Sequence, residues 1–164
     1  MNLFWLDASA LAKRYLNEVG TPLVNYFFSR VEPDDLLCLL EGIGEVTSIL
    51  VRRKNSGQLS PADARLAAKE LHSEISQRNE VEKIHPTTDQ VSASWSLIES
   101  HSINSTDAII LRCVLDRAAE LRADGFDLVL LSADERLLKA AKLEGLITFN
   151  PETDSQADLD ALIV

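Results

Sequence analysis

Two aspartates follow apolar runs that have the length and composition of buried strands. Asp7 comes directly after residues 3–6, and Asp134 comes after residues 128–131 and a Ser132-Ala133 step. Ligands of parallel α/β sheets bind just beyond the carboxyl ends of the strands. The spacing therefore predicts that both carboxylates lie at a ligand site on one edge of a sheet.

Two further acids can join this site. Asp107 opens a predicted helix after a polar turn. Glu45 lies in the first turn of a helix predicted from about residue 44, after the apolar run at 36–40. Glu41, four residues earlier, is an alternative for the same role. All these acids are far apart in sequence, so only the fold can bring them together.

Carboxylates that converge at one end of a sheet favour a particular chemistry. They repel one another, and burial raises the cost of their charge further. A hard cation such as Mg²⁺ relieves both effects, and it needs few protein ligands because it keeps several waters. One or two such ions lower the pKa of a bound water and support hydrolysis of a phosphodiester bond. Taken singly, each acid is better explained as a helix cap, and only the group of four favours a metal site.

Hydrophobic periodicity, together with residues that typically start or end helices and strands, predicts strands and helices that alternate along the chain. Short apolar runs predict strands at residues 3–6, 36–40, 81–84, 128–131 and 147–149. Amphipathic stretches predict helices at 10–16, with Ser9 as the N-cap, and at 21–31, 44–54, 61–77, 87–98, 108–122 and 135–141. Strands that alternate with helices predict an α/β domain whose mainly parallel sheet carries helices on both faces.

Composition limits the function classes. The chain has 164 residues, 46% of them hydrophobic, and a formal net charge of −10, so non-specific nucleic-acid binding is disfavoured. No apolar run reaches the roughly 18 residues of a membrane span, and the N-terminus lacks the features of a signal peptide. Cys38 and Cys113 both lie in apolar stretches, which favours free thiols in a reducing cytoplasm. We therefore expect a cytoplasmic protein with no membrane partner.

The sequence resembles a known family. Motifs in the expected order, from Asp7 to about Pro151, look like those of PIN-domain ribonucleases, and especially of VapC-type toxins from toxin–antitoxin pairs. The segments that carry the resemblance are Leu6-Asp7-Ala8-Ser9-Ala10-Leu11, Glu45-Val46-Thr47-Ser48, Thr106-Asp107-Ala108-Ile109 and Leu131-Ser132-Ala133-Asp134-Glu135-Arg136-Leu137.

The resemblance implies a fold, an activity and partners. It implies a three-layer α/β/α PIN-like domain over residues 1–151. The composition of residues 152–164, polar and acidic, predicts a mobile tail after this domain. It also implies an endoribonuclease that depends on Mg²⁺ or Mn²⁺, acts on an RNA substrate, forms a homodimer and is blocked by a small antitoxin protein.

The resemblance also assigns roles to individual residues. The catalytic and metal-binding acids would be Asp7, Glu45, Asp107 and Asp134, and Ser9 would support and orient the first of them. The segment at residues 40–44, Leu-Glu-Gly-Ile-Gly, is richer in glycine than the family pattern, which leaves the choice between Glu45 and Glu41 open.

Two other classes of function compete with this interpretation. A phosphoryl-transfer protein of the haloacid-dehalogenase type would need a second Asp where Ser9 stands. A response-regulator receiver would need an acidic pair at the first strand end and a late lysine, and neither is evident. The main alternative is a catalytically inactive PIN-like module that binds a partner.

Overall fold

A five-stranded parallel sheet forms the centre of the molecule, with the strand order β3-β2-β1-β4-β5. The computed structural model describes residues 1–163. The strands are β1 (Asn2–Leu6), β2 (Leu36–Leu39), β3 (Glu82–Ile84), β4 (Asp127–Leu131) and β5 (Ile147–Phe149). The helices are α1 (Ala8–Leu11), α2 (Thr21–Phe28), α3 (Leu40–Asn55), α4 (Pro61–Leu71), α5 (Thr88–His101), α6 (Ser105–Ala123), α7 (Glu135–Leu143) and α8 (Gln156–Leu162), with short helical turns η1 (Ala12–Arg14), η2 (Pro33–Asp35) and η3 (His72–Ser76).

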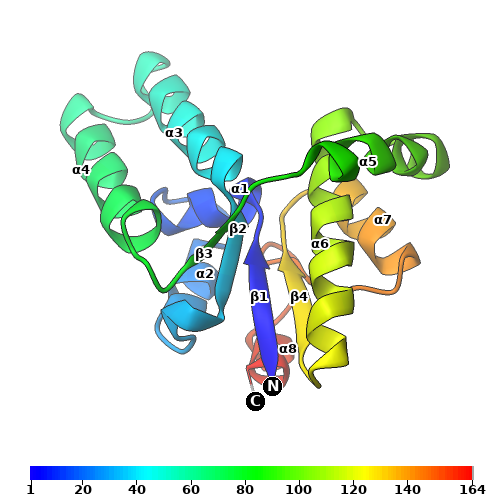
Figure 1. The fold of residues 1–164 in the computed structure, drawn as a ribbon. Coiled ribbons are helices and arrows are strands. Elements are labelled where there is room, and N and C mark those ends of the chain that lie inside the picture. The colour runs from blue at the N-terminus through cyan, green and yellow to red at the C-terminus, as the bar shows by residue number, and fades with distance from the viewer. Residues whose placement is uncertain (164) are drawn as a thin grey trace.

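Helices cover both faces of this sheet and make three layers, as the sequence predicted. Figure 1 shows α3 and α4 on one side of the sheet and α5, α6 and α7 on the other. Side chains of the central strand alternate between the faces, because successive residues of a strand point to opposite sides. Phe4 and Leu6 pack into the first core, with Val46 and Leu50 of α3, whereas Trp5 packs into the second core. The fully buried positions of β1, β2 and β4 therefore all carry apolar residues, whichever face they point to.

Each core layer contains one cysteine. Cys38 of β2 is buried in the first core and Cys113 of α6 in the second, and neither forms a disulfide. None of the helices described in residues 1–163 has the length and apolar content required to cross a membrane.

Several boundaries differ from the predicted ones. The helix expected from residue 44 begins at Leu40, which places Glu41 in its first turn and Glu45 in its second. Two glycines in its first turns hid this start, since glycine lowers helix propensity. The first helix is capped by Asp7 rather than by Ser9, and α2 ends at Phe28 instead of Val31.

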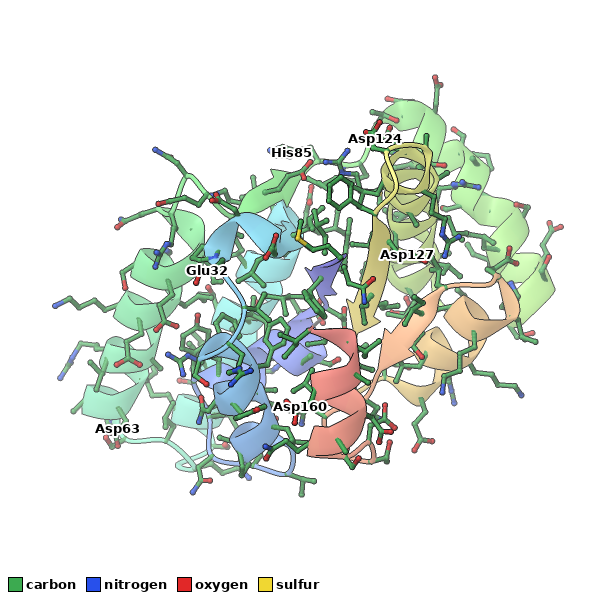
Figure 2. The ribbon with its side chains drawn as sticks, turned by 90° about the horizontal axis from the view of Figure 1, so that it is seen from below. Glu32, Asp63, His85, Asp124, Asp127 and Asp160 are labelled. Carbon is green, nitrogen blue, oxygen red and sulfur yellow. The ribbon has the colours of Figure 1, made fainter. Side chains whose placement is uncertain are left out.

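The segment after Pro151 also differs from the expected polar tail. Ser155 caps helix α8, whose Leu159 side chain is fully buried in the first core. Tyr26 Oη donates a hydrogen bond to Asp160 Oδ1 at 2.7 Å, and Asn2 Nδ2 donates one to the carbonyl of Leu162 at 2.9 Å. Figure 2, viewed from below, shows Asp160 on this helix. The described part of the segment is therefore joined to the domain at the end where β1 begins.

Truncation of Leu159 tests how firmly α8 is attached. We expect Leu159→Ala to lower the free energy of unfolding by about 2–4 kcal/mol, since the Leu159 side chain is completely buried in the first core. Leu143→Ala, at a position that is 69% exposed on α7, should change it by less than about 0.5 kcal/mol. Urea denaturation followed by circular dichroism measures both, and equal small effects would mean that the last helix contributes nothing to the core.

Candidate active site

Two neighbouring strands deliver two of the four acids to one edge of the sheet. Leu6 of β1 pairs with Leu131 of β4, and the backbone N–H of Asp7 continues this ladder by donating to the carbonyl of Leu131 at 3.0 Å. From β1 the chain adds β2 and β3 on one side of this strand and then β4 and β5 on its other side. The direction in which the strands are added therefore reverses at β1. Ligand sites of parallel sheets form at such a reversal.

A cluster of hydroxyl groups holds the Asp7 carboxylate. Its Oδ2 atom accepts hydrogen bonds from Ser132 Oγ at 2.9 Å, from Ser9 Oγ at 2.5 Å and from Ser9 N at 3.2 Å. Ser9 Oγ also accepts from Ala133 N at 2.9 Å, and Ser132 Oγ accepts from Asp134 N at 3.0 Å. Asp7 is only 7% exposed, and Ser132 is fully buried. The two serines therefore connect the end of β1 with the loop that carries Asp134.

The other two aspartates are also positioned through one oxygen each. Asp134 caps α7, because its Oδ1 atom accepts from the backbone N–H of Arg136 at 2.8 Å and of Leu137 at 3.0 Å. Asp107 Oδ2 accepts from Asn104 Nδ2 at 2.7 Å, while its own N–H donates to Asn104 Oδ1 at 2.9 Å. Within residues 1–163 no hydrogen bond ends on the second carboxylate oxygen of Asp7, Asp107 or Asp134. Each aspartate thus keeps one oxygen for a ligand.

Helix α3 brings both candidate glutamates to the same place. Glu41 and Glu45 line a cavity of about 160 Å³ together with Asp7 and with Thr106 of α6. Partial burial and the charge of Asp7 raise the pKa of Glu45, and Arg52 opposes that shift. Glu41 instead contributes to the raised pKa of Cys113 in α6, after desolvation and the charge of Asp116. This difference favours Glu45 over Glu41 as the glutamate that interacts with the aspartates.

The charges of the other three acids all act on Asp107. Desolvation raises the pKa of Asp107 to about 6, with further contributions from the charges of Asp134, Asp7 and Glu45, and Arg136 lowers it again. The fold therefore brings the four acids predicted from the sequence into one negatively charged cluster. Such clustering costs folding free energy as long as every carboxyl is ionised.

The four acids offer the type of ligand atom that a hard divalent cation prefers. All four side chains offer carboxylate oxygens, which Mg²⁺ and Mn²⁺ prefer, and each has at least one oxygen without a hydrogen-bond partner among the described residues. In the described part of the chain, no three acidic, histidine or cysteine side chains lie close enough to form a metal-binding group as they stand. An ion would therefore have to draw the carboxylates closer together.

Ser132 and Asn104 are positioning residues that the sequence analysis did not single out. The available signal was a hydroxyl residue between a buried strand and Asp134, and an amide three residues before Asp107. Both patterns are also common at ordinary helix starts, where such side chains cap the backbone. Pattern alone could not assign them to the cluster.

No protein-family model matches this sequence, and no curated protein matches it significantly. Similar solved structures do exist. VapC20 of Mycobacterium tuberculosis, described as a toxin that cleaves the sarcin–ricin loop, aligns with a TM-score of 0.58 at 16% identity, over 84% of this chain and 94% of that chain.

Two further solved structures are complexes. FitAcB from Neisseria gonorrhoeae aligns with a TM-score of 0.60 at 14% identity, over 93% of this chain and 100% of that chain. FitAB bound to the IR36 DNA fragment gives a TM-score of 0.63 at 12% identity, over 94% and 99%. These similarities, together with the parallel sheet between two helical layers, show that the chain has the three-layer α/β/α PIN-like fold predicted from its motifs.

Proposed function

We propose that this protein is a metal-dependent endoribonuclease and the toxin of a VapBC-type toxin–antitoxin pair. The observation that carries the proposal is the cluster of Asp7, Glu45, Asp107 and Asp134, in which desolvation and the charges of the other three acids raise the pKa of Asp107 to about 6. The structural similarity to a toxin that cleaves the sarcin–ricin loop supports a nuclease role. It also supports RNA as the substrate.

The aspartates are the proposed metal ligands. Asp7, Asp107 and Asp134 would hold Mg²⁺ or Mn²⁺ through the oxygens that make no hydrogen bond, and Glu45 would orient ligands or water from α3. When bound, such an ion lowers the pKa of a water molecule and neutralises charge on the scissile phosphate. No side chain of the protein then needs to act as the nucleophile.

The remaining residues of the site keep these ligands in place. Ser9 and Ser132 fix the rotamer of Asp7 with neutral donors, so the carboxylate keeps its full negative charge. Asn104 does the same for Asp107. Because Asp107 binds its proton more tightly than an ordinary carboxyl, a cation must displace that proton below about pH 6.

We further propose a homodimer that an antitoxin protein inhibits in the cytoplasm. Support for the antitoxin comes from the FitAB and FitAcB structures, which align with almost the whole chain. The two buried free thiols agree with a reducing compartment.

Cleavage assays test the nuclease proposal directly. We expect the purified protein to cut a sarcin–ricin-loop hairpin or total cellular RNA with Mg²⁺ or Mn²⁺ and to lose this activity in EDTA. Asp7→Asn should lower the rate at least about a hundredfold, because it removes a metal ligand. Asp124→Asn is the matched control, since this exposed acid follows α6 at the opposite end of the sheet (Figure 2).

Two outcomes would contradict the mechanism. Cleavage that persists in EDTA or in Asp7→Asn would exclude a metal held by Asp7. Complete inactivity of the wild-type protein on all these RNAs would favour the alternative of an inactive PIN-like module that binds a partner.

The electrostatic cost of the cluster gives a second prediction. The pKa of Asp107 is higher in the folded state than the ordinary value of 3.8, so its ionised form destabilises the fold above about pH 6. This group therefore makes the metal-free wild type more stable as the pH falls from 7 toward 5. We expect Asp107→Asn to raise stability in EDTA at pH 7 by about 1 kcal/mol, a value that allows for solvent screening of this half-exposed group.

Thermal melts measure this effect with and without metal. The pH dependence between pH 7 and 5 should be weaker in Asp107→Asn than in the wild type, and Mg²⁺ should stabilise the wild type more than the variant. Asp124→Asn should behave as the wild type in both tests. A clear loss of stability of Asp107→Asn in EDTA would show that helix capping outweighs repulsion at this position.

A further inference from the structure

Positive charge flanks the acidic cluster on the α3 side, although the protein as a whole carries −10. A cavity of about 680 Å³ reaches from the last turn of α3 to Ser9 and Ala133, which lie close in sequence to Asp7 and Asp134. Arg52 and Arg53 line it. A cavity that ends at residues close in sequence to two of the cluster acids thus carries guanidinium groups along its wall.

A second basic cavity, of about 310 Å³, lies on the other side of the cluster. Its lining includes His101 of α5 and Arg136 and Lys139 of α7. Arg136 stands in the first turn of α7, two residues after the cap residue Asp134. The helix dipole disfavours a cation in the first turn, so local helix stability does not explain this arginine.

Arg52 and Arg136 are also unpaired, unlike most arginines of the chain. Six of the ten arginines form ion pairs with carboxylates, and Arg30 lies over the ring of Tyr26. Among residues 1–163, the side chains of Arg52, Arg65 and Arg136 make no hydrogen bond or ion pair. Of these three, Arg52 acts on the pKa of Glu45 and Arg136 on that of Asp107. The two free guanidinium groups next to the cluster are therefore available for an anion.

The other cations of the larger cavity are already neutralised. Arg53 pairs with Glu18 at 3.0 Å, and Lys13, only 3% exposed, pairs with Glu18 at 3.1 Å and Glu152 at 2.5 Å. These pairs tie η1 to the end of α3 and to the turn after β5. Their role is structural, so among the described residues that line this cavity Arg52 is the cation without a carboxylate partner.

We propose that Arg52 and Arg136 bind the RNA phosphates on the two sides of the scissile bond, so that a single strand crosses the acidic cluster from α3 to α7. This inference rests on the proposed nuclease function. The helices that carry the arginines pack on opposite faces of the sheet, and the carboxylates lie at the sheet edge between them. A metal ion can neutralise the scissile phosphate, but the neighbouring phosphates still face the carboxylates. Guanidinium groups suit them, because they bind phosphate oxygens in pairs.

Binding measurements test the proposal independently of cleavage. Fluorescence anisotropy of a short, labelled, single-stranded RNA of mixed sequence would be followed with Mg²⁺ in the Asp7→Asn background. We expect Arg52→Gln and Arg136→Gln each to weaken binding about fivefold or more. Each should also reduce the slope of log K against log salt by about 0.7, the value for one phosphate contact on a single strand.

Matched variants separate phosphate binding from a general effect of charge or folding. Arg65→Gln removes an equally unpaired, exposed arginine from α4, and it should leave affinity and salt slope nearly unchanged. Arg52→Lys and Arg136→Lys should keep most of the slope, because they keep the charge. All variants should melt within a few degrees of their background, since the side chains are exposed.

Kinetics in the otherwise wild-type protein give a further readout. Contacts to flanking phosphates are made equally in the ground and transition states, so Arg52→Gln and Arg136→Gln should raise KM with little change in kcat. Equal effects of all three Arg→Gln variants, or no effect of any, would overturn the proposal while leaving the nuclease function intact. If the wild type cuts no RNA but Arg52→Gln and Arg136→Gln still weaken RNA binding selectively, the proposed nuclease function is wrong. The two arginines would then still bind RNA phosphates.

Discussion

The repulsion among four carboxylates, two at the ends of β1 and β4 and two on α3 and α6, is the constraint on which the rest of the site depends. Elsewhere in the chain, acids are commonly neutralised by arginine or lysine, as in the pairs of Glu18 with Lys13 and Arg53. In the cluster, the donors to Asp7 and Asp107 are hydroxyl and amide groups, which orient a carboxylate without cancelling its charge. The fold therefore fixes these acids in place and leaves their charge for a cation.

The scaffold supplies the rigidity that this arrangement requires. β1 and β4 lie at the centre of the sheet, between two apolar layers, and their paired ends leave Asp7 and the Ser132 loop little freedom. Like-charged residues that must stay close need such a rigid support, because flexible loops would move and let the carboxylates separate. Beyond the last backbone pair of β1 and β4, hydrogen bonds of Ser9 and Ser132 hold the two strand ends together.

Much of this organisation was predictable from the sequence. The strands, the parallel sheet and the positions of Asp7 and Asp134 follow from apolar runs that end in an acid, since such runs specify both burial and direction. The start of α3 did not follow, because Gly42 and Gly44 mask a helix that packing stabilises. Helix α8 was missed because its composition is polar and its burial rests on few apolar side chains, chiefly Leu159. The roles of Ser132 and Arg136 depend on spatial neighbours, which no local pattern contains.

The placement of one thiol in each core layer has a practical consequence. Burial raises the pKa of Cys38 to about 12 and that of Cys113 to about 11, so almost no reactive thiolate exists in the closed molecule. An alkylating reagent can modify either sulfur only after its own layer opens to solvent. Each cysteine thus reports on the opening of its own core layer. Equal labelling rates of Cys38 and Cys113 indicate that both layers open together, and different rates indicate that one layer opens without the other.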